Sequence, residues 1–201
     1  MQDQNLDREE LLHIAETVRG NTVSFGYIVE KYKDYIYNLC LRMTGNRHEA
    51  EDLTQEAFLK SFKNLKQYNV QYKFSNWLYT LTLNIVRNHL RRKKVLSFLP
   101  FGKTGENEDG EETYSEPAAA EDRPAGKPVS GAAEEWTEKL VMSLSPSLRP
   151  AFILRYMHDL KYDEIAGILG IPVNTVKVHL NRAHTYLYEK YYKEYSETFL
   201  P

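Results

Sequence analysis

One stretch of the chain combines cationic and aromatic side chains and contains no acidic ones. Between residues 57 and 105 there are ten Lys or Arg residues and no Asp or Glu, although the chain of 201 residues has a net charge of only −2. The same stretch carries aromatic rings from Phe58 to Phe101. Cations that pair with phosphates and rings that stack on bases are the groups that hold single-stranded nucleic acid. The alternative is that the rings fill a packed core and that the acidic residues simply lie elsewhere in the sequence. Charge and ring content alone favour the two interpretations equally.

A second segment, YDEIAGILGIPVNTVKVHLNRA at residues 162–183, has the spacing of a helix-turn-helix. Ala166 is small enough for two helices to cross there, and Gly170 permits the turn four residues later. The helix after this turn presents amide, hydroxyl, methyl and cationic groups on its outward arc, and such groups read base edges in a major groove. The residues of this arc are Asn174, Thr175, Lys177, Val178, Asn181 and Arg182. An αα-hairpin with a solvated polar face is the alternative.

Apolar residues recur at helical spacing over nearly the whole chain, which predicts an all-α fold. Helices are expected over about 11–18, 25–44, 46–66 and 75–95, and again from about residue 133. Gly45 supplies a stop for the second helix, while Asn46 with Glu49 resembles a capping box for the third. Two small helical domains are therefore expected, at residues 1–96 and 133–201.

The segment between these domains has a different composition. Residues 97–131 are rich in Gly, Pro, Ala and Ser, and they carry eight acids against three bases with little periodicity. Such a composition is typical of a flexible linker, which we assign to residues 97–132.

Other features of the sequence argue against a membrane protein or an enzyme. No apolar run is long enough to cross a bilayer and residues 1–8 are polar, so we expect a cytoplasmic protein without membrane insertion. The single cysteine, Cys40, is expected to be a buried hydrophobe. His48 and Asp52 have the spacing of metal ligands on one helix face, but the first turns of a helix commonly carry such solvated groups. Without a Gly-rich phosphate loop, zinc spacing or nucleophile motif, we expect no enzyme, no metal and no cofactor.

Several short blocks occur in the order of a known family. AEDLTQEAF at 50–58 and FSNWLY at 74–79 precede LSP at 144–146, EIA at 164–166 and TVK at 175–177. The first two are similar to region 2, and the last three to region 4, of sigma factors of the extracytoplasmic-function (ECF) group, the smallest members of the sigma-70 family of bacterial RNA polymerase subunits. The resemblance implies that region 2 docks on the clamp of core polymerase and captures the melted minus-10 element. It also implies that region 4 reads the duplex minus-35 element, and that an anti-sigma factor regulates the protein.

The resemblance assigns roles to residues of both domains. For core polymerase it indicates an outward arc of the helix at 46–66, with one leucine among polar groups: Asp52, Gln55, Glu56 and Leu59. For the minus-10 element it indicates the loop at 67–76 and the following helix: Tyr68, Asn69, Tyr72, Asn76, Asn84, Arg87, Arg91 and Arg92. For the minus-35 element it indicates the outward arc of the helix-turn-helix given above. Trp77 either contacts DNA or packs in the core.

Two points depart from the family or compete with it. Asn174 stands where the family usually has a small residue, so no minus-35 sequence preference is carried over. The tail from Tyr186 to Pro201 has no family role and is expected to pack against region 4. A helix-turn-helix regulator that acts without core polymerase is the alternative class, and it explains the second domain but not the cationic, aromatic stretch.

Overall fold

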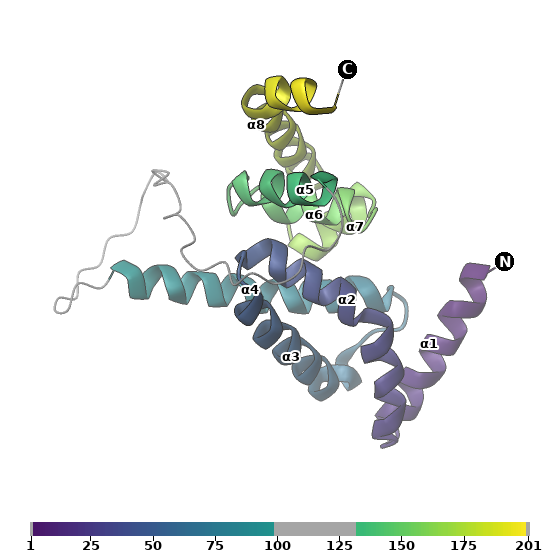
Figure 1. Ribbon diagram of the computed structural model, residues 1–201. Coiled ribbons are helices and arrows are strands. Elements are labelled where there is room, and N and C mark those ends of the chain that lie inside the picture. Colours follow the sequence, from purple (N-terminus) through teal and green to yellow (C-terminus); the bar gives the residue numbers. More distant parts are fainter. Residues whose placement is uncertain (1, 99–131, 200–201) are drawn as a thin grey trace.

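The computed structural model describes residues 2–98 and 132–199, and within these ranges every regular element is a helix (Figure 1). The predicted all-α fold is confirmed. Most of the predicted linker lies outside the described residues, while its first two residues and its last one belong to helices.

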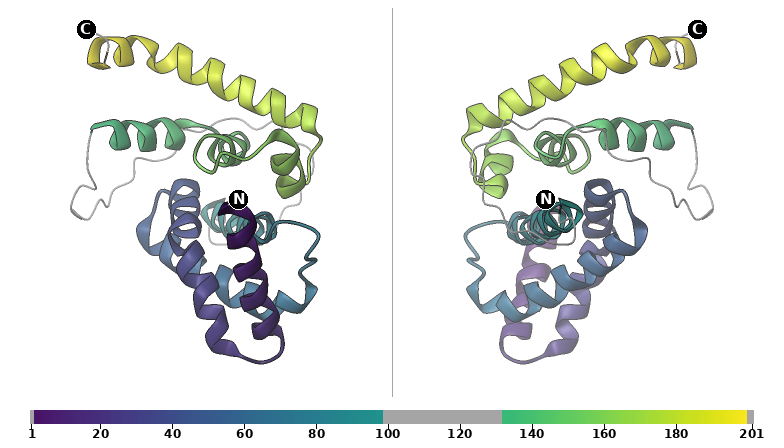
Figure 2. Two further views of the ribbon diagram at one scale, coloured as in Figure 1. Left: turned by 90° about the vertical axis from the view of Figure 1, so that its right-hand side faces the viewer. Right: turned by 90° about the vertical axis from the view of Figure 1, so that its left-hand side faces the viewer.

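The described helices form a lower and an upper body (Figure 2). The lower body contains α1 (Gln2–Val18), η1 (Thr22–Ser24), α2 (Phe25–Thr44), α3 (Arg47–Asn64), η2 (Leu65–Gln67) and α4 (Phe74–Phe98). The upper body contains α5 (Ala132–Ser143), α6 (Arg149–Tyr156), α7 (Tyr162–Leu169) and α8 (Val173–Phe199).

The core of the lower body is made by the apolar stripes of α2, α3 and α4. Ile28 and Leu39 of α2 are fully buried, as are Ala57 of α3 and Leu78 of α4. Helix α1 packs on α2, where the buried Glu10 carboxylate accepts hydrogen bonds from Lys31 Nζ (2.5 Å) and Tyr32 Oη (2.6 Å). These bonds supply the partners that a carboxylate needs when it leaves water.

The single thiol of the chain belongs to this core. Cys40 is fully buried, as predicted, and burial raises the pKa of its thiol to about 12. It therefore contributes packing and no nucleophile.

The junction between α2 and α3 follows the capping signals only in part. Gly45 ends α2 with a φ of +69°, and Asn46 Oδ1 accepts from the backbone N–H of Glu49 at 3.0 Å. The Glu49 carboxylate does not complete the predicted box, because it bonds His89 Nε2 (3.0 Å) and Lys93 Nζ (2.5 Å) of α4. Glu49 thus fastens the start of α3 to α4.

The helix-turn-helix forms as predicted. In the first turn of α7 the Glu164 side chain accepts from the backbone N–H of Lys161 at 3.0 Å, and Gly170 caps the end of the helix with a φ of +68°. The turn then leads into α8, whose Val176 and Leu180 are buried against the rest of the upper body.

Helix α8 continues past the helix-turn-helix to Phe199. Tyr191 is buried and meets Trp136 of α5 edge to face, with ring centroids 6.0 Å apart. Tyr188 and Tyr192 lie together on the exposed side of α8. The predicted packing of the tail against the upper body therefore holds for Tyr191.

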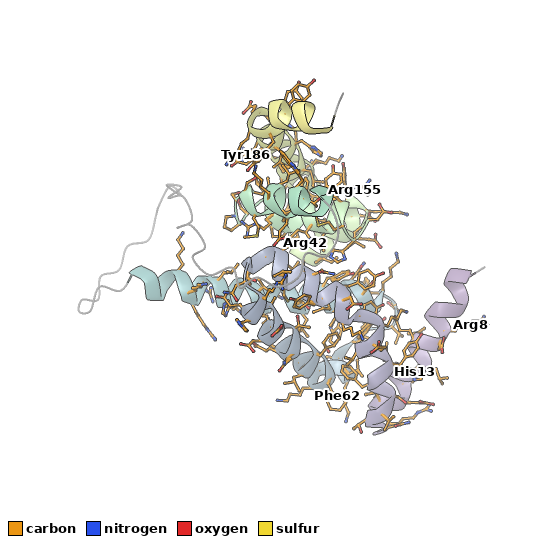
Figure 3. The ribbon with its side chains drawn as sticks, in the orientation of Figure 1. Arg8, His13, Arg42, Phe62, Arg155 and Tyr186 are labelled. Atoms are coloured by element: carbon orange, nitrogen blue, oxygen red, sulfur yellow. The ribbon has the colours of Figure 1, made fainter. Side chains whose placement is uncertain are left out.

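The upper body lies against α2 and α4 (Figures 1 and 2). Helix α7 contacts α4, while α5 and α6 contact the C-terminal part of α2. Arg42 lies where α2 meets the upper body, and Phe62 lies low on α3, away from it (Figure 3).

Candidate functional site

Helix α3 presents the four residues predicted to dock on core polymerase. Asp52, Gln55, Glu56 and Leu59 are all exposed, and the Leu59 side chain is 62% exposed. Leucines inside this helix, such as Leu53, are buried, so Leu59 stands outside the packed stripe. An apolar side chain held in water among polar ones gains free energy when a partner covers it.

An apolar groove of about 480 Å³ runs beside Leu59, between α2 and α3. Its lining residues are Phe25, Val29, Lys33, Thr54, Gln55, Phe58, Leu59 and Phe62. Val29 and Phe62 were not predicted to belong to this surface, because they lie off the buried stripes of their helices. Val29 follows directly after the buried Ile28, and this extra apolar residue beside the stripe was the available signal.

The loop between η2 and α4 holds three of the predicted minus-10 residues, Tyr68, Asn69 and Tyr72. Asn69 Oδ1 accepts from the backbone N–H of Gln71 at 3.0 Å, and Tyr68 Oη donates to the backbone carbonyl of Tyr72 at 2.6 Å. These bonds close the loop on itself. The Tyr72 side chain is left 69% exposed at its tip, which suits a ring that stacks on an unpaired base.

Aromatic packing fixes the base of this loop. The Tyr68 ring meets Phe74 edge to face, with centroids 5.2 Å apart, and lies 5.6 Å from the Trp77 ring. Phe74 is buried, whereas Tyr68 and Trp77 are partly buried against the core. Tyr68 and Trp77 therefore support the loop from within, while Tyr72 projects from it.

The remaining minus-10 residues lie along α4. Asn84, Arg87, Arg91 and Arg92 are exposed, and Arg91 Nη2 donates to Asn88 Oδ1 at 3.2 Å. Asn76, in the first turn of α4, is half-buried, and its side chain is among the groups that lower the pKa of the Glu164 carboxylate of α7. Its Oδ1 is buried and has no partner among the described residues.

Helix α8 presents the predicted duplex-reading residues on one face. Asn174, Lys177, Val178, Asn181 and Arg182 are exposed, and Thr175 is half-buried. Val176, Leu180 and Ala183 are buried on the opposite face, as predicted. The outward face thus offers amide, methyl and guanidinium groups at the spacing of one helix side, which fits a major groove.

The described residues show no metal cluster and no membrane segment. No group of three or more His, Cys, Asp and Glu side chains is placed there to hold a metal ion. None of the helices in the described part of the chain is both long and apolar enough to cross a membrane.

Two family models match the chain, in the order of the two bodies. Sigma-70 region 2 matches residues 28–95, and Sigma-70, region 4 matches residues 134–187. The chain therefore belongs to the sigma-70 family of RNA polymerase sigma factors, within the extracytoplasmic-function (ECF) group that includes its relative SigW, described below. The family that the sequence blocks predicted is confirmed.

Named relatives cover most of the chain. The ECF RNA polymerase sigma factor SigW of Bacillus subtilis (strain 168) is 36% identical over 169 residues, which span 84% of this chain and 89% of SigW. The RNA polymerase sigma-H factor of Pseudomonas aeruginosa is 29% identical, over 89% of this chain and 92% of its own length.

Solved structures share the fold. CnrH, in complex with the cytosolic domain of CnrY, is similar with a TM-score of 0.60 at 17% identity, over 88% of this chain and 93% of that one. The sigma factor RpoE in complex with the anti-sigma factor NepR, from Bartonella quintana, gives a TM-score of 0.61 at 20% identity, over 82% of this chain and 94% of that one.

Proposed function

We propose that this sigma factor divides promoter recognition between its two bodies. The α3 face and its groove dock on the clamp of core polymerase. The loop at 67–76 and the exposed face of α4 hold the melted minus-10 strand, and α8 reads the duplex minus-35 element. The protein itself catalyses no reaction and acts in the cytoplasm, where core polymerase makes RNA.

One observation carries this division: the three surfaces have different chemistry and lie on different elements. The α3 face is acidic with an exposed leucine and an apolar groove. The loop and α4 offer an exposed tyrosine and arginines, while α8 offers amides and cations on a single helix face. The first combination suits a protein partner, the second suits a single DNA strand and the third suits a DNA duplex.

Run-off transcription with purified core polymerase and a genomic promoter pool tests the overall role. We expect the full chain to direct transcripts from a subset of promoters. A chain that binds promoter duplexes but neither binds core nor yields transcripts would instead be a helix-turn-helix regulator acting alone.

Paired variants test the division between strand and duplex. Tyr72→Ala and Asn84→Ala should weaken binding of single-stranded minus-10 DNA by about 1–3 kcal/mol and leave minus-35 duplex binding intact. Lys177→Ala and Asn181→Ala should do the reverse, by a similar amount. Equal losses on both ligands for all four variants would contradict the division.

An anti-sigma factor is the remaining proposed partner. The solved neighbours include a sigma factor bound to an anti-sigma factor, and the apolar groove beside Leu59 is a surface that such a protein would cover. Competition between that protein and core polymerase for the α3 face would then set the activity of this chain.

A further inference from the structure

A cavity of about 580 Å³ lies where α2 faces α5, α6 and the turn after α6. Its lining residues are Tyr35, Asn38, Arg42, Thr137, Leu140, Phe152, Tyr156, Met157 and His158. Tyr35 and Tyr156 are exposed and the others are half-buried, so the cavity opens to solvent beside the two tyrosines. None of these residues belongs to the surfaces proposed for core polymerase or promoter DNA. Sites for small organic molecules have volumes of about 300–1,000 Å³, so this cavity is large enough for one.

Both bodies contribute rings to the lining of this cavity. Phe152 and Tyr156 of α6 pack together, with ring centroids 4.8 Å apart. The ring of His184 on α8 meets Tyr156 edge to face, with centroids 5.2 Å apart, and so helps to fix its position. Tyr35 of α2 lies 6.0 Å from the imidazole of His158, which belongs to the turn after α6. Rings held in this way offer faces and edges to a flat aromatic ligand.

The charge of the lining is positive. Arg42, which lies where α2 meets the upper body (Figure 3), contributes a guanidinium group, and no Asp or Glu occurs among the described residues that line the cavity. Burial, followed by the charge of Arg42, lowers the pKa of His158 to about 4, so the imidazole is neutral at pH 7. The guanidinium therefore acts within a few ångströms of His158 and of the cavity. Such surroundings attract an anion and repel a cation.

The imidazole of His158 contains a polar atom that lacks a partner. Its Nδ1 forms a hydrogen bond with Tyr79 Oη of α4 at 3.1 Å. Burial raises the pKa of Tyr79, so the phenol keeps its proton, and a phenol that donates to Nδ1 leaves the imidazole proton on Nε2. Nε2 is buried and has no hydrogen-bond partner among the described residues. A buried N–H costs free energy until an acceptor reaches it.

We propose that this cavity binds a small planar aromatic carboxylate. The ring of the ligand lies against Tyr35, Phe152 and Tyr156, and its carboxylate accepts hydrogen bonds from the Arg42 guanidinium and from Nε2 of His158. A lining with one arginine and no acid matches a single negative charge, which favours a carboxylate over a doubly charged phosphate. Because α2 belongs to the lower body and α5 and α6 to the upper one, the bound ligand contacts both and stabilises their contact.

A matched pair of probes tests the chemistry of the site. 2-Naphthoate is planar and carries one negative charge at pH 7.5, and 2-naphthamide has the same shape without the charge. Isothermal titration calorimetry on the full chain should show a single site for naphthoate. Naphthamide should bind about tenfold more weakly or less, because a neutral amide loses the charge-assisted hydrogen bonds. Equal affinities for the two probes, or no binding of naphthoate, would overturn the proposal.

Matched variants locate the bound probe. Arg42→Met removes the cation of the cavity, and Lys33→Met removes the cation of the apolar groove beside Leu59, each leaving an unbranched side chain. Arg42→Met should weaken naphthoate binding about tenfold or more, and Lys33→Met should leave it unchanged. Leu140→Trp, which fills the cavity from α5, should abolish binding, and circular dichroism checks that each variant is folded. If folded Arg42→Met binds naphthoate no more weakly than Lys33→Met does, the probe lies elsewhere and the proposal is wrong.

A measurement on the unmodified chain does not depend on the folding of any variant. In a chain whose histidines carry nitrogen-15, saturating naphthoate should shift the Nε2 resonance of His158, because the carboxylate becomes its hydrogen-bond partner. The resonances of His48, which is exposed on α3, should stay in place. A His158 resonance that does not move at saturation would show that the carboxylate does not reach this imidazole, and the proposed site would be wrong.

Discussion

At the scale of single residues, the exposed Leu59 shows how position gives a common side chain a role. Other leucines of the lower body, such as Leu53 and Leu78, are buried in the core, so their loss would unfold it. Leu59 contributes little to folding because it remains 62% exposed. The free energy of burying the Leu59 side chain is therefore available for binding a partner, together with that of the groove to which Val29 and Phe62 contribute.

Leu59→Arg should therefore weaken core binding without unfolding the chain. The change places a charge in an apolar contact, which should cost roughly 1–3 kcal/mol, or about tenfold or more in affinity. Leu12→Arg makes the same change at an exposed leucine of α1 and should leave affinity unaltered. Core affinity is measured by fluorescence anisotropy and folding by circular dichroism. A natively folded Leu59→Arg protein with full core affinity would remove the α3 face from the docking site.

At the scale of elements, the glycines that end helices act through backbone geometry alone. Gly170 has a φ of +68° and no atom within 4 Å of where a Cβ would lie, so it is required by conformation and not by space. Gly167, three residues earlier in the same helix, also has open space around it but lies in ordinary helical backbone.

The two glycines should respond oppositely to alanine. Gly170→Ala should destabilise the upper body by about 1–2 kcal/mol, because a side chain is strained in the left-handed region. Gly167→Ala should stabilise it by about 0.5–1 kcal/mol through helix propensity. Urea unfolding followed by circular dichroism measures both. Changes of the same sign would show that the turn does not depend on the conformation of Gly170.

The helices themselves could be predicted from the sequence because their signals are local. Apolar spacing and stop residues such as Gly45 and Gly170 act within a few positions, and the observed elements follow them. Side chains with distant partners could not be predicted. Glu49 reads as half of a local cap, yet it reaches Lys93 across 44 positions. Lys73 is exposed and Glu164 is half-buried, the two lie 91 positions apart in the sequence, and no periodicity marks such a pair.

At the scale of the whole molecule, the contact between the two bodies contains His158, a residue type whose ordinary pKa of 6.5 is close to neutral pH. Burial, followed by the nearby charge of Arg42, lowers the pKa of His158 from its ordinary value of 6.5 to about 4. The groups that face the imidazole are Tyr35 and Arg42 of α2 and Tyr79 of α4. None of them carries a carboxylate that would stabilise the protonated imidazole. Contact with the lower body therefore favours the neutral form of His158.

A fall in pH should weaken the contact between the upper and the lower body. Because His158 binds a proton more readily when the two bodies are apart, its contribution to the stability of their contact is fully present above about pH 6.5 and is lost as the pH falls towards 4. At pH 5 the contact between the bodies should have lost roughly 2 kcal/mol of stability relative to pH 7. Fluorescence energy transfer between one dye on α3 and another on α8 is followed from pH 7.5 to 5. It should fall in the wild-type chain and stay level in His158→Phe. Identical profiles for the two proteins would show that His158 does not control the contact.

The burial of Cys40 has a chemical consequence for the whole chain. Oxidants and alkylating agents react with the thiolate, and a pKa of about 12 leaves on the order of one molecule in 10⁵ in that form at pH 7. Cys40 is the single cysteine of the sequence, so no disulfide can form within the chain. Oxidants should therefore leave the Cys40 sulfur reduced while the chain stays folded.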